Sequence, residues 1–131
     1  MEIVNEYPPN IKQIEQKVTP TQNTVFTYGD KLYNPGGHII PPHLLRHEEV
    51  HSVRQGQNPS EWWERYLSDP QFRIEEEVAA YQVQYSFVKA GTDSRSVKRT
   101  FLQKLARDLS SPMYGKVITF EEAKRRIKGE N

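Results

Sequence analysis

The segment from Pro41 to Gly56 constrains the fold of this chain more than any other. Two consecutive prolines suit the opening turn of a helix, because proline has a fixed φ and no amide hydrogen to leave unpaired there. Gly56 suits the C-terminal cap, so we expect a helix over residues 42–55. His47 and His51 lie four residues apart on this helix and therefore point the same way. Both imidazole rings can then reach one metal ion.

The composition limits which other side chains can complete such a site. The chain of 131 residues has no cysteine, so a transition metal must be held by its four histidines and seventeen acidic residues. The length predicts one domain. With 35% apolar and 27% charged residues, the chain has the balance of a globular protein and not of a disordered one.

Glu48 follows the first histidine directly. Its carboxylate lies beside the histidine face, where it can hydrogen-bond a metal-bound water instead of ligating the ion. This is the H-E-x-x-H arrangement of zinc hydrolases, with two ligands and a general base. Catalytic zinc usually takes a third protein ligand. The extended pattern H-E-x-x-H-x-x-G-x-x-H is excluded, because Arg54 and Gln57 stand where it needs Gly and His.

A glutamate on a following helix is the remaining source of a third ligand. Residues 70–89 carry apolar side chains at helical spacing, namely Ile74, Val78, Tyr81, Tyr85 and Val88. Relative to the middle of this stripe, Glu77 lies about 60° away, Glu75 about 100° away and Glu76 nearly opposite. Glu77 is therefore the predicted ligand. The alternative is that Arg46 or Arg73 pairs with its carboxylate.

The rest of the chain predicts an α+β fold. Residues 1–23, with three prolines, read as an irregular lead-in, and residues 24–33 as an antiparallel hairpin around Gly29 and Asp30. Residues 38–40 could add a short edge strand. A short helix capped by Ser60 should end before Asp69, and two longer helices should cover residues 70–89 and 94–109. A last helix should begin at Thr119. We therefore expect a small antiparallel sheet followed by four or five helices.

The segments "LLRHEEVHSVRQG", "WWERYLSDPQFRIEEEVAAYQ" and "LSSPMYGKVITFEEA" together resemble a known family. They are similar to the small zincin-like proteins of tailed phages and prophages, of the gluzincin type that adds a glutamate to H-E-x-x-H. The resemblance covers residues 24–127 and implies a minimal zincin-like metallopeptidase domain over residues 24–131. It also implies His47, His51 and Glu77 as Zn²⁺ ligands and Glu48 as the catalytic residue. It brings no substrate.

Three further residues need an interpretation. Tyr114 precedes a glycine in a predicted turn and is our candidate for stabilising negative charge during catalysis; the alternative is a packing tyrosine. His43 cannot share an ion with both other histidines, because it lies two turns, about 12 Å, from His51. We expect His43 to be a residue of the helix start and His38 to be a loop residue.

These residues predict a zinc metallopeptidase that cleaves a peptide or protein substrate, with a strand above the helix aligning the peptide. The alternative is a non-catalytic, zinc-stabilised binding or scaffold protein.

Residues 91–131 hold ten Lys or Arg against five acids, but these are spaced through helices, which favours a solvated surface over a nucleic-acid site. The chain has no signal-peptide pattern and no apolar run of membrane length. We expect the cytoplasm of a bacterium or a phage-infected cell.

Overall fold

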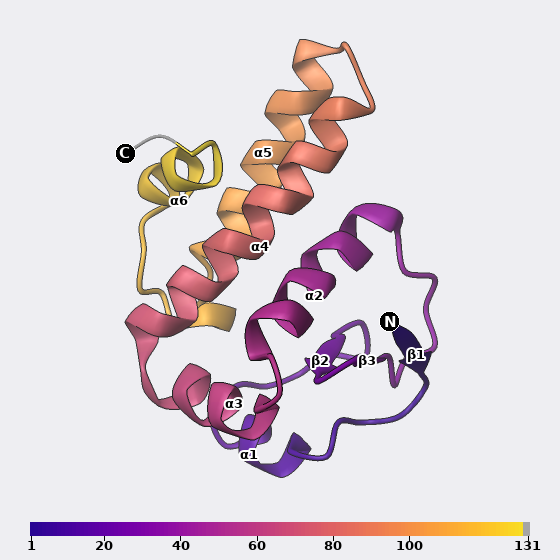
Figure 1. The fold of residues 1–131 in the computed structure, drawn as a ribbon. Coiled ribbons are helices and arrows are strands. Elements are labelled where there is room, and N and C mark those ends of the chain that lie inside the picture. Colours follow the sequence, from indigo (N-terminus) through magenta and orange to yellow (C-terminus); the bar gives the residue numbers. More distant parts are fainter. Residues whose placement is uncertain (130–131) are drawn as a thin grey trace.

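The computed structural model describes residues 1–129, which form a three-stranded sheet and six α-helices (Figure 1). The predicted α+β class is confirmed. The elements are β1 (Glu2–Val4), α1 (Ile11–Glu15), β2 (Phe26–Tyr28), β3 (Lys31–Tyr33), α2 (Pro42–Gln55), α3 (Pro59–Ser68), α4 (Pro70–Ala90), α5 (Arg95–Leu109), the 3₁₀ turn η1 (Pro112–Tyr114) and α6 (Phe120–Ile127). None of these helices combines the length and the apolar character that a membrane crossing requires.

The sheet has the strand order β1-β3-β2. β2 and β3 pair antiparallel, which confirms the hairpin around Gly29 and Asp30. β1 pairs parallel with the other edge of β3, with Ile3 opposite Leu32. The expectation of a purely antiparallel sheet is therefore wrong. A parallel partner must come from a distant segment, and the N-terminal strand, separated from β3 by α1 and β2, supplies it.

The expectation that residues 1–23 are irregular is also wrong. They contain β1 and α1, and Ile14 of α1 is only 1% exposed. Ile14 belongs to a cluster of buried aromatic residues from the hairpin and α3, namely Phe26, Tyr33, Trp62, Trp63 and Tyr66. The sequence pattern failed here because a helix of five residues is too short to show an apolar period.

The expected strand at residues 38–40 does not form. Ile39 is 94% exposed, and the Asn34 side chain donates a hydrogen bond of 2.7 Å to the His38 carbonyl, which holds this segment as a loop. β1 already occupies the second edge of β3, so no strand edge of β3 is left for these residues to pair with.

The helix boundaries follow the predicted caps closely. α2 spans the expected residues, and Gly56 ends it with a φ of 59°, a conformation that glycine adopts without strain. Thr119 caps α6 by accepting a hydrogen bond from the Glu122 amide. The predicted cap of α3 is wrong by two residues: Asn58, not Ser60, accepts from the Glu61 amide at 3.2 Å. Pro59 then takes the first helical position, where a missing amide hydrogen costs nothing.

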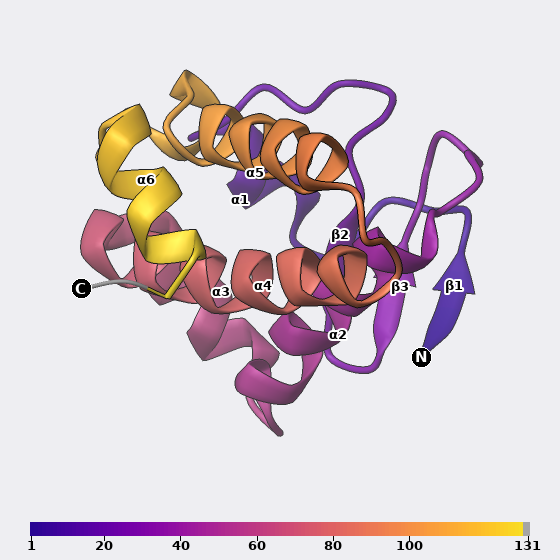
Figure 2. The same cartoon turned by 90° about the horizontal axis from the view of Figure 1, so that it is seen from above.

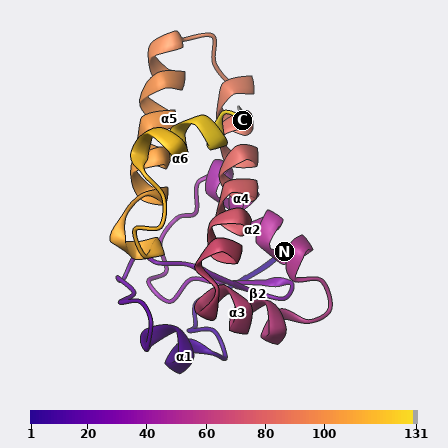
Figure 3. The same ribbon diagram turned by 90° about the vertical axis from the view of Figure 1, so that its left-hand side faces the viewer.

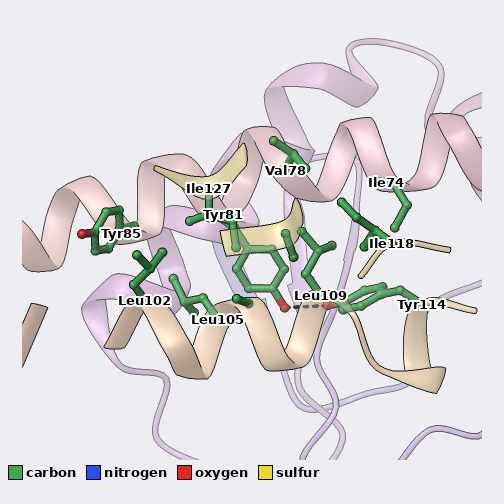
Figure 4. Close-up of a cluster of buried hydrophobic side chains, with 12 residues drawn as sticks. Ile74, Val78, Tyr81, Tyr85, Leu102, Leu105, Leu109, Tyr114, Ile118 and Ile127 are labelled. Carbon is green, nitrogen blue, oxygen red and sulfur yellow. Dashed lines mark hydrogen bonds between the residues drawn. The ribbon is translucent and has the colours of Figure 1, made fainter. Parts of the chain in front are cut away.

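α4 is the central helix of the molecule. α2 packs along one side of it, α5 and α6 pack on another, and α3 lies against its N-terminal end (Figures 1, 2 and 3). The apolar stripe of α4 faces α5, α6 and η1 and forms the larger core cluster with residues such as Leu105, Leu109 and Ile127 (Figure 4). β2 lies on the far side of α2 from this core. α2 is thus held between the hairpin and α4.

Ile14→Ala should lower the free energy of unfolding by about 2–5 kcal/mol, because it removes a buried side chain and leaves a cavity between α1 and the aromatic cluster. Ile39→Ala is the matched control and should change stability by less than about 0.5 kcal/mol. Urea unfolding followed by tryptophan fluorescence measures both. Equal stability of Ile14→Ala and the parent would show that α1 does not belong to the core.

Candidate metal centre

The structure brings together His47 and His51 of α2 and Glu77 of α4. Each offers one ligand atom within 4.8 Å of the other two, and the three residues are 3–5% exposed. Nε2 of His47 lies 3.0 Å from one oxygen of Glu77, and Nε2 of His51 lies 3.2 Å from the other. The predicted trio of ligands therefore shares one point between the two helices, where it could hold a metal ion.

Charge explains why Glu77 can be buried there. Burial alone disfavours the carboxylate, but His51 and His47 outweigh this and hold the pKa of Glu77 well below its usual range. Burial likewise disfavours protonated His51, but the Glu77 carboxylate more than offsets it and raises the pKa of His51 to about 9. The Tyr66 hydroxyl also donates a hydrogen bond of 2.6 Å to Glu77. In the metal-free protein, Glu77 is therefore a charged acceptor for the two histidines of α2 and for the Tyr66 hydroxyl of α3.

Neither arginine that could have neutralised Glu77 does so. Arg46 forms an exposed pair with Glu49 at 3.0 Å. Arg73 donates to the main-chain carbonyls of Tyr66 and Tyr114, at 2.9 and 3.2 Å. This leaves the histidines as the cationic partners of Glu77.

The prediction that Glu76 faces away from the core is wrong. Glu76 is only 4% exposed. It accepts hydrogen bonds from the Arg54 guanidinium at 2.7–3.0 Å and from Nε1 of Trp62 at 2.7 Å. Arg54 holds the pKa of Glu76 below its usual value, although burial opposes this. Helical phase predicts exposure of the opposite face only when a helix has one buried face, whereas α4 is covered by α2 and α3 as well as by α5 and α6.

Gln84 lies about two turns beyond Glu77 on α4 and is a site residue that sequence reasoning missed. Its Oε1 lies 2.8 Å from Nδ1 of His47, and its Nε2 lies 2.9 Å from Nδ1 of His43. Gln84 follows Glu77 by seven residues, which places both on the same side of the helix. That spacing was a usable signal, but a pattern of metal-ligating residue types does not include a neutral amide.

The two remaining histidines are placed as expected. His43 lies at the start of α2, with its ring edge-on to Phe101 at 4.9 Å between centroids, and it is not among the gathered ligand atoms. His38 is exposed on the loop before α2, where its Nε2 lies 3.1 Å from the carbonyl oxygen of Gln22. Neither takes part in the candidate centre directly.

Glu48 lies beside the three ligands and is 6% exposed. Burial raises the pKa of its carboxyl above the usual value, and the positive charges of His51 and His47 offset this only in part. The Thr27 hydroxyl of β2 donates to Oε2 of Glu48 at 3.2 Å. Glu48 and Glu77 are thus two neighbouring carboxyl groups whose pKa values are shifted in opposite directions.

A cavity of about 570 Å³ opens onto this centre. His47, Glu48, His51 and Glu77 form one wall of it, while α5 and residues 21–27 form others. Most of the remaining lining is aliphatic or aromatic, from residues such as Trp62 and Leu105. The centre therefore faces a partly open, mostly apolar space of the size that small-molecule or side-chain sites have.

Tyr114 reaches the same cavity but makes no direct hydrogen bond to the three ligands. Its hydroxyl lies 2.9 Å from the Tyr81 hydroxyl (Figure 4), and the Tyr81 ring contacts the His47 ring edge-on at 4.5 Å between centroids. Burial and the charge of Glu77 raise the pKa of both phenols well above the usual range. Both hydroxyls therefore stay neutral and able to donate at physiological pH.

The strand that could align a peptide is already engaged. Thr27 in the middle of β2 faces α2 with its carbonyl oxygen, which accepts from Nε2 of Gln55 at 2.8 Å and from Nε1 of Trp63 at 2.9 Å. The expected strand at residues 38–40 is absent from the described chain. An added peptide strand would have to displace these side chains from the Thr27 carbonyl.

No protein-family model, curated protein or solved structure matches this chain. The resemblance to gluzincin-type proteins therefore stays a prediction from the motifs. What the structure adds is the geometry of a His-His-Glu group that could hold a metal ion.

The metal-free protein should lose stability as the pH rises from about 6.5 to 9. The pKa of His51 is raised from 6.5 to about 9, so the folded protein keeps a proton that the unfolded chain releases in this range. Stabilisation by this proton is complete below pH 6.5 and is lost as the pH passes 9, by about 3 kcal/mol. Chemical unfolding in the presence of a chelator measures it.

Glu77→Gln is the control for this pH dependence, because it removes the charge that raises the pKa of His51. Its stability should change much less between pH 6.5 and 9. If the parent and Glu77→Gln show the same slope, the buried His51–Glu77 pair does not exist as described.

Proposed function

We propose that the protein is a zinc-dependent metallopeptidase that hydrolyses peptide bonds. The observation that carries this proposal is the gathering of His47, His51 and Glu77 within 4.8 Å, next to the buried carboxyl of Glu48, on the wall of a cavity. Two imidazoles, one carboxylate and an adjacent glutamate are the parts that the H-E-x-x-H chemistry requires.

The donor set fits zinc. Zn²⁺ accepts imidazole nitrogen and carboxylate oxygen, and its catalytic sites use three protein ligands and leave a fourth position open. His47 directs Nδ1 to Gln84 and Nε2 to Glu77, so the ring already presents Nε2 to the shared point. The cavity that these residues line would give a substrate access to a bound ion.

Glu48 is the proposed general base and acid. A bound zinc ion would lower the pKa of a coordinated water toward about 7 and polarise the substrate carbonyl. Glu48 would take a proton from the attacking water at its carboxylate and deliver it to the leaving amine. In the metal-free protein burial raises the pKa of Glu48, and a carboxyl whose pKa lies nearer neutrality is better suited to accepting and releasing a proton. Thr27 would hold the carboxylate in place.

Tyr114 remains our proposed donor to the negative charge that develops on the substrate oxygen, now together with Tyr81. One of the two hydroxyls must donate to the other across their 2.9 Å contact, which leaves the second hydrogen of the pair free. Both residues line the cavity, so that hydrogen can be offered to a bound substrate.

A second candidate function is a non-catalytic binding or scaffold protein that uses zinc to join α2 to α4. Its support is the burial of the centre, since Glu48 and the three ligands are 3–6% exposed. In that case the metal stabilises the fold, and Glu48 has no chemical role. Zinc content alone does not separate the two functions. The effect of a Glu48 substitution on peptide hydrolysis does.

The purified parent should hold about one zinc ion per chain after dialysis against metal-free buffer. Glu77→Ala should bind zinc at least tenfold more weakly, because one of three ligands is lost. Glu76→Ala is the matched control: it changes the neighbouring buried glutamate, which bonds Arg54 and Trp62, and should leave zinc affinity within about threefold. A parent that takes up no zinc would exclude both candidate functions.

Glu48→Gln should keep its zinc and lose at least about 100-fold in peptide hydrolysis, because the amide cannot accept the proton of the attacking water. Glu49→Gln, the exposed neighbour, should cleave like the parent. A library of proteome-derived peptides with product detection by mass spectrometry provides the assay. Zinc-loaded parent that cleaves nothing would favour the scaffold, and a Glu48→Gln variant as active as the parent would refute the mechanism.

A further inference from the structure

Gln84 connects two histidines of α2, of which only His47 belongs to the candidate metal centre. Its amide lies between Nδ1 of His47, a proposed ligand, and Nδ1 of His43, which is one turn earlier and is not a ligand. Gln84 is 3% exposed, so water does not compete freely for these contacts. The three side chains form a continuous hydrogen-bonded row from Phe101, which contacts His43, to the candidate centre.

The two ends of a glutamine amide have opposite roles. Oε1 can only accept a hydrogen bond and Nε2 can only donate. Nδ1 of His47 must therefore carry a hydrogen, and Nδ1 of His43 must offer a lone pair. In the metal-free protein Nε2 of His47 donates to the Glu77 carboxylate. With the other hydrogen held on Nδ1, Nε2 is the nitrogen that would give up its hydrogen and offer its lone pair to an ion.

We propose that Gln84, itself oriented by His43, is a positioning residue that fixes the hydrogen on Nδ1 of His47 and so makes Nε2 its metal-binding nitrogen. The inference rests on the proposed zinc site, because it concerns how that site is prepared for the ion. It also gives His43 a role: this histidine orients the amide and does not ligate.

The reversed amide would work against metal binding. It would present its NH₂ group to Nδ1 of His47, which favours hydrogen on Nε2, and a nitrogen that carries hydrogen has no lone pair for an ion. The same reversal would aim the amide oxygen at the lone pair of His43 and lose that hydrogen bond. Burial, together with the positive charges of Lys104 and His47, lowers the pKa of His43 and supports its neutral, accepting form.

The neighbours of Gln84 show why this task falls to an amide. The carboxylate of Glu77 already balances the positive charge of the histidines from the other side. An acidic residue at position 84 would add a second buried negative charge, whereas a glutamine supplies the acceptor without it. The contact also shows how a ligand on α2 is oriented by α4, the helix that carries the third ligand.

The test is the zinc affinity of metal-free parent and variants, measured by competition with a chromophoric chelator. Gln84→Leu should bind zinc about 10- to 100-fold more weakly, the effect that loss of a hydrogen-bonding partner of a ligand has in metal sites. Gln84→Glu should bind at least as tightly as the parent, because a carboxylate also accepts from Nδ1. Gln82→Leu, on the same helix but bonded to the Arg126 carbonyl, should bind like the parent.

A spectroscopic signature separates positioning from mere packing. In zinc-loaded parent, the Nδ1 hydrogen of His47 should give a slowly exchanging imidazole signal in ¹H–¹⁵N spectra. This signal should persist in Gln84→Glu and be lost or exchange rapidly in Gln84→Leu. His43→Leu should weaken zinc binding several-fold, since the amide is no longer oriented.

Unchanged zinc affinity in folded Gln84→Leu would overturn the inference while leaving the zinc site intact. If Gln84→Leu does not fold, His43→Leu and Gln84→Glu decide: parent-like affinity in the first, or a large loss in the second, would overturn it. A parent that binds no zinc would instead overturn the proposed function.

Discussion

The arrangement of the helices depends on one buried interaction, the carboxylate of Glu77 between Nε2 of His47 and Nε2 of His51. A carboxylate at 3% exposure is costly unless positive charge or a metal ion compensates it. Because the compensating groups are on α2 and the carboxylate is on α4, these helices have to pack face to face. Their contact is extended by the Arg54–Glu76 pair at 2.7 Å, in which Arg54 lies about one turn beyond His51 on α2 and Glu76 directly precedes Glu77 on α4.

The hairpin fixes the other side of α2. Gln55 at the end of α2 donates to the Thr27 carbonyl and accepts from the Gly29 amide, and Ser52 donates to the Gly29 carbonyl at 2.6 Å. These bonds also bring Thr27 to the carboxyl of Glu48. The sheet therefore helps to orient Glu48, the carboxyl beside the three candidate ligands. The opposite pKa shifts of Glu48 and Glu77 come from this difference in surroundings: one meets a single hydroxyl and the other meets two imidazoles and a phenol.

The sequence predicted the parts of the fold that local chemistry determines. The prolines and Gly56 bound α2, and the spacing of four residues put His47 and His51 on one face. The helical phase of α4 selected Glu77, and the structure places its carboxylate beside the two histidines. Each of these predictions needed only one element and its own residues.

The failures concern interactions between distant segments. Nothing in residues 1–23 shows that β1 will pair parallel with β3 or that Ile14 will enter the aromatic cluster. Glu76 is buried because Arg54 and Trp62, on two other helices, reach it. Gln84 was overlooked because its importance lies in what it bonds to and not in its residue type. Tertiary packing decides such cases, and a single sequence records it only indirectly.

Anomalous X-ray diffraction at the zinc absorption edge, on crystals of zinc-loaded protein, tests the central claim most directly. The account predicts one strong site between α2 and α4, with Nε2 of His47 and of His51 about 2.0–2.1 Å from the ion and a Glu77 oxygen about 2.0–2.2 Å from it. Zinc bound only elsewhere on the protein, or no anomalous signal between these helices in zinc-soaked crystals, would contradict it.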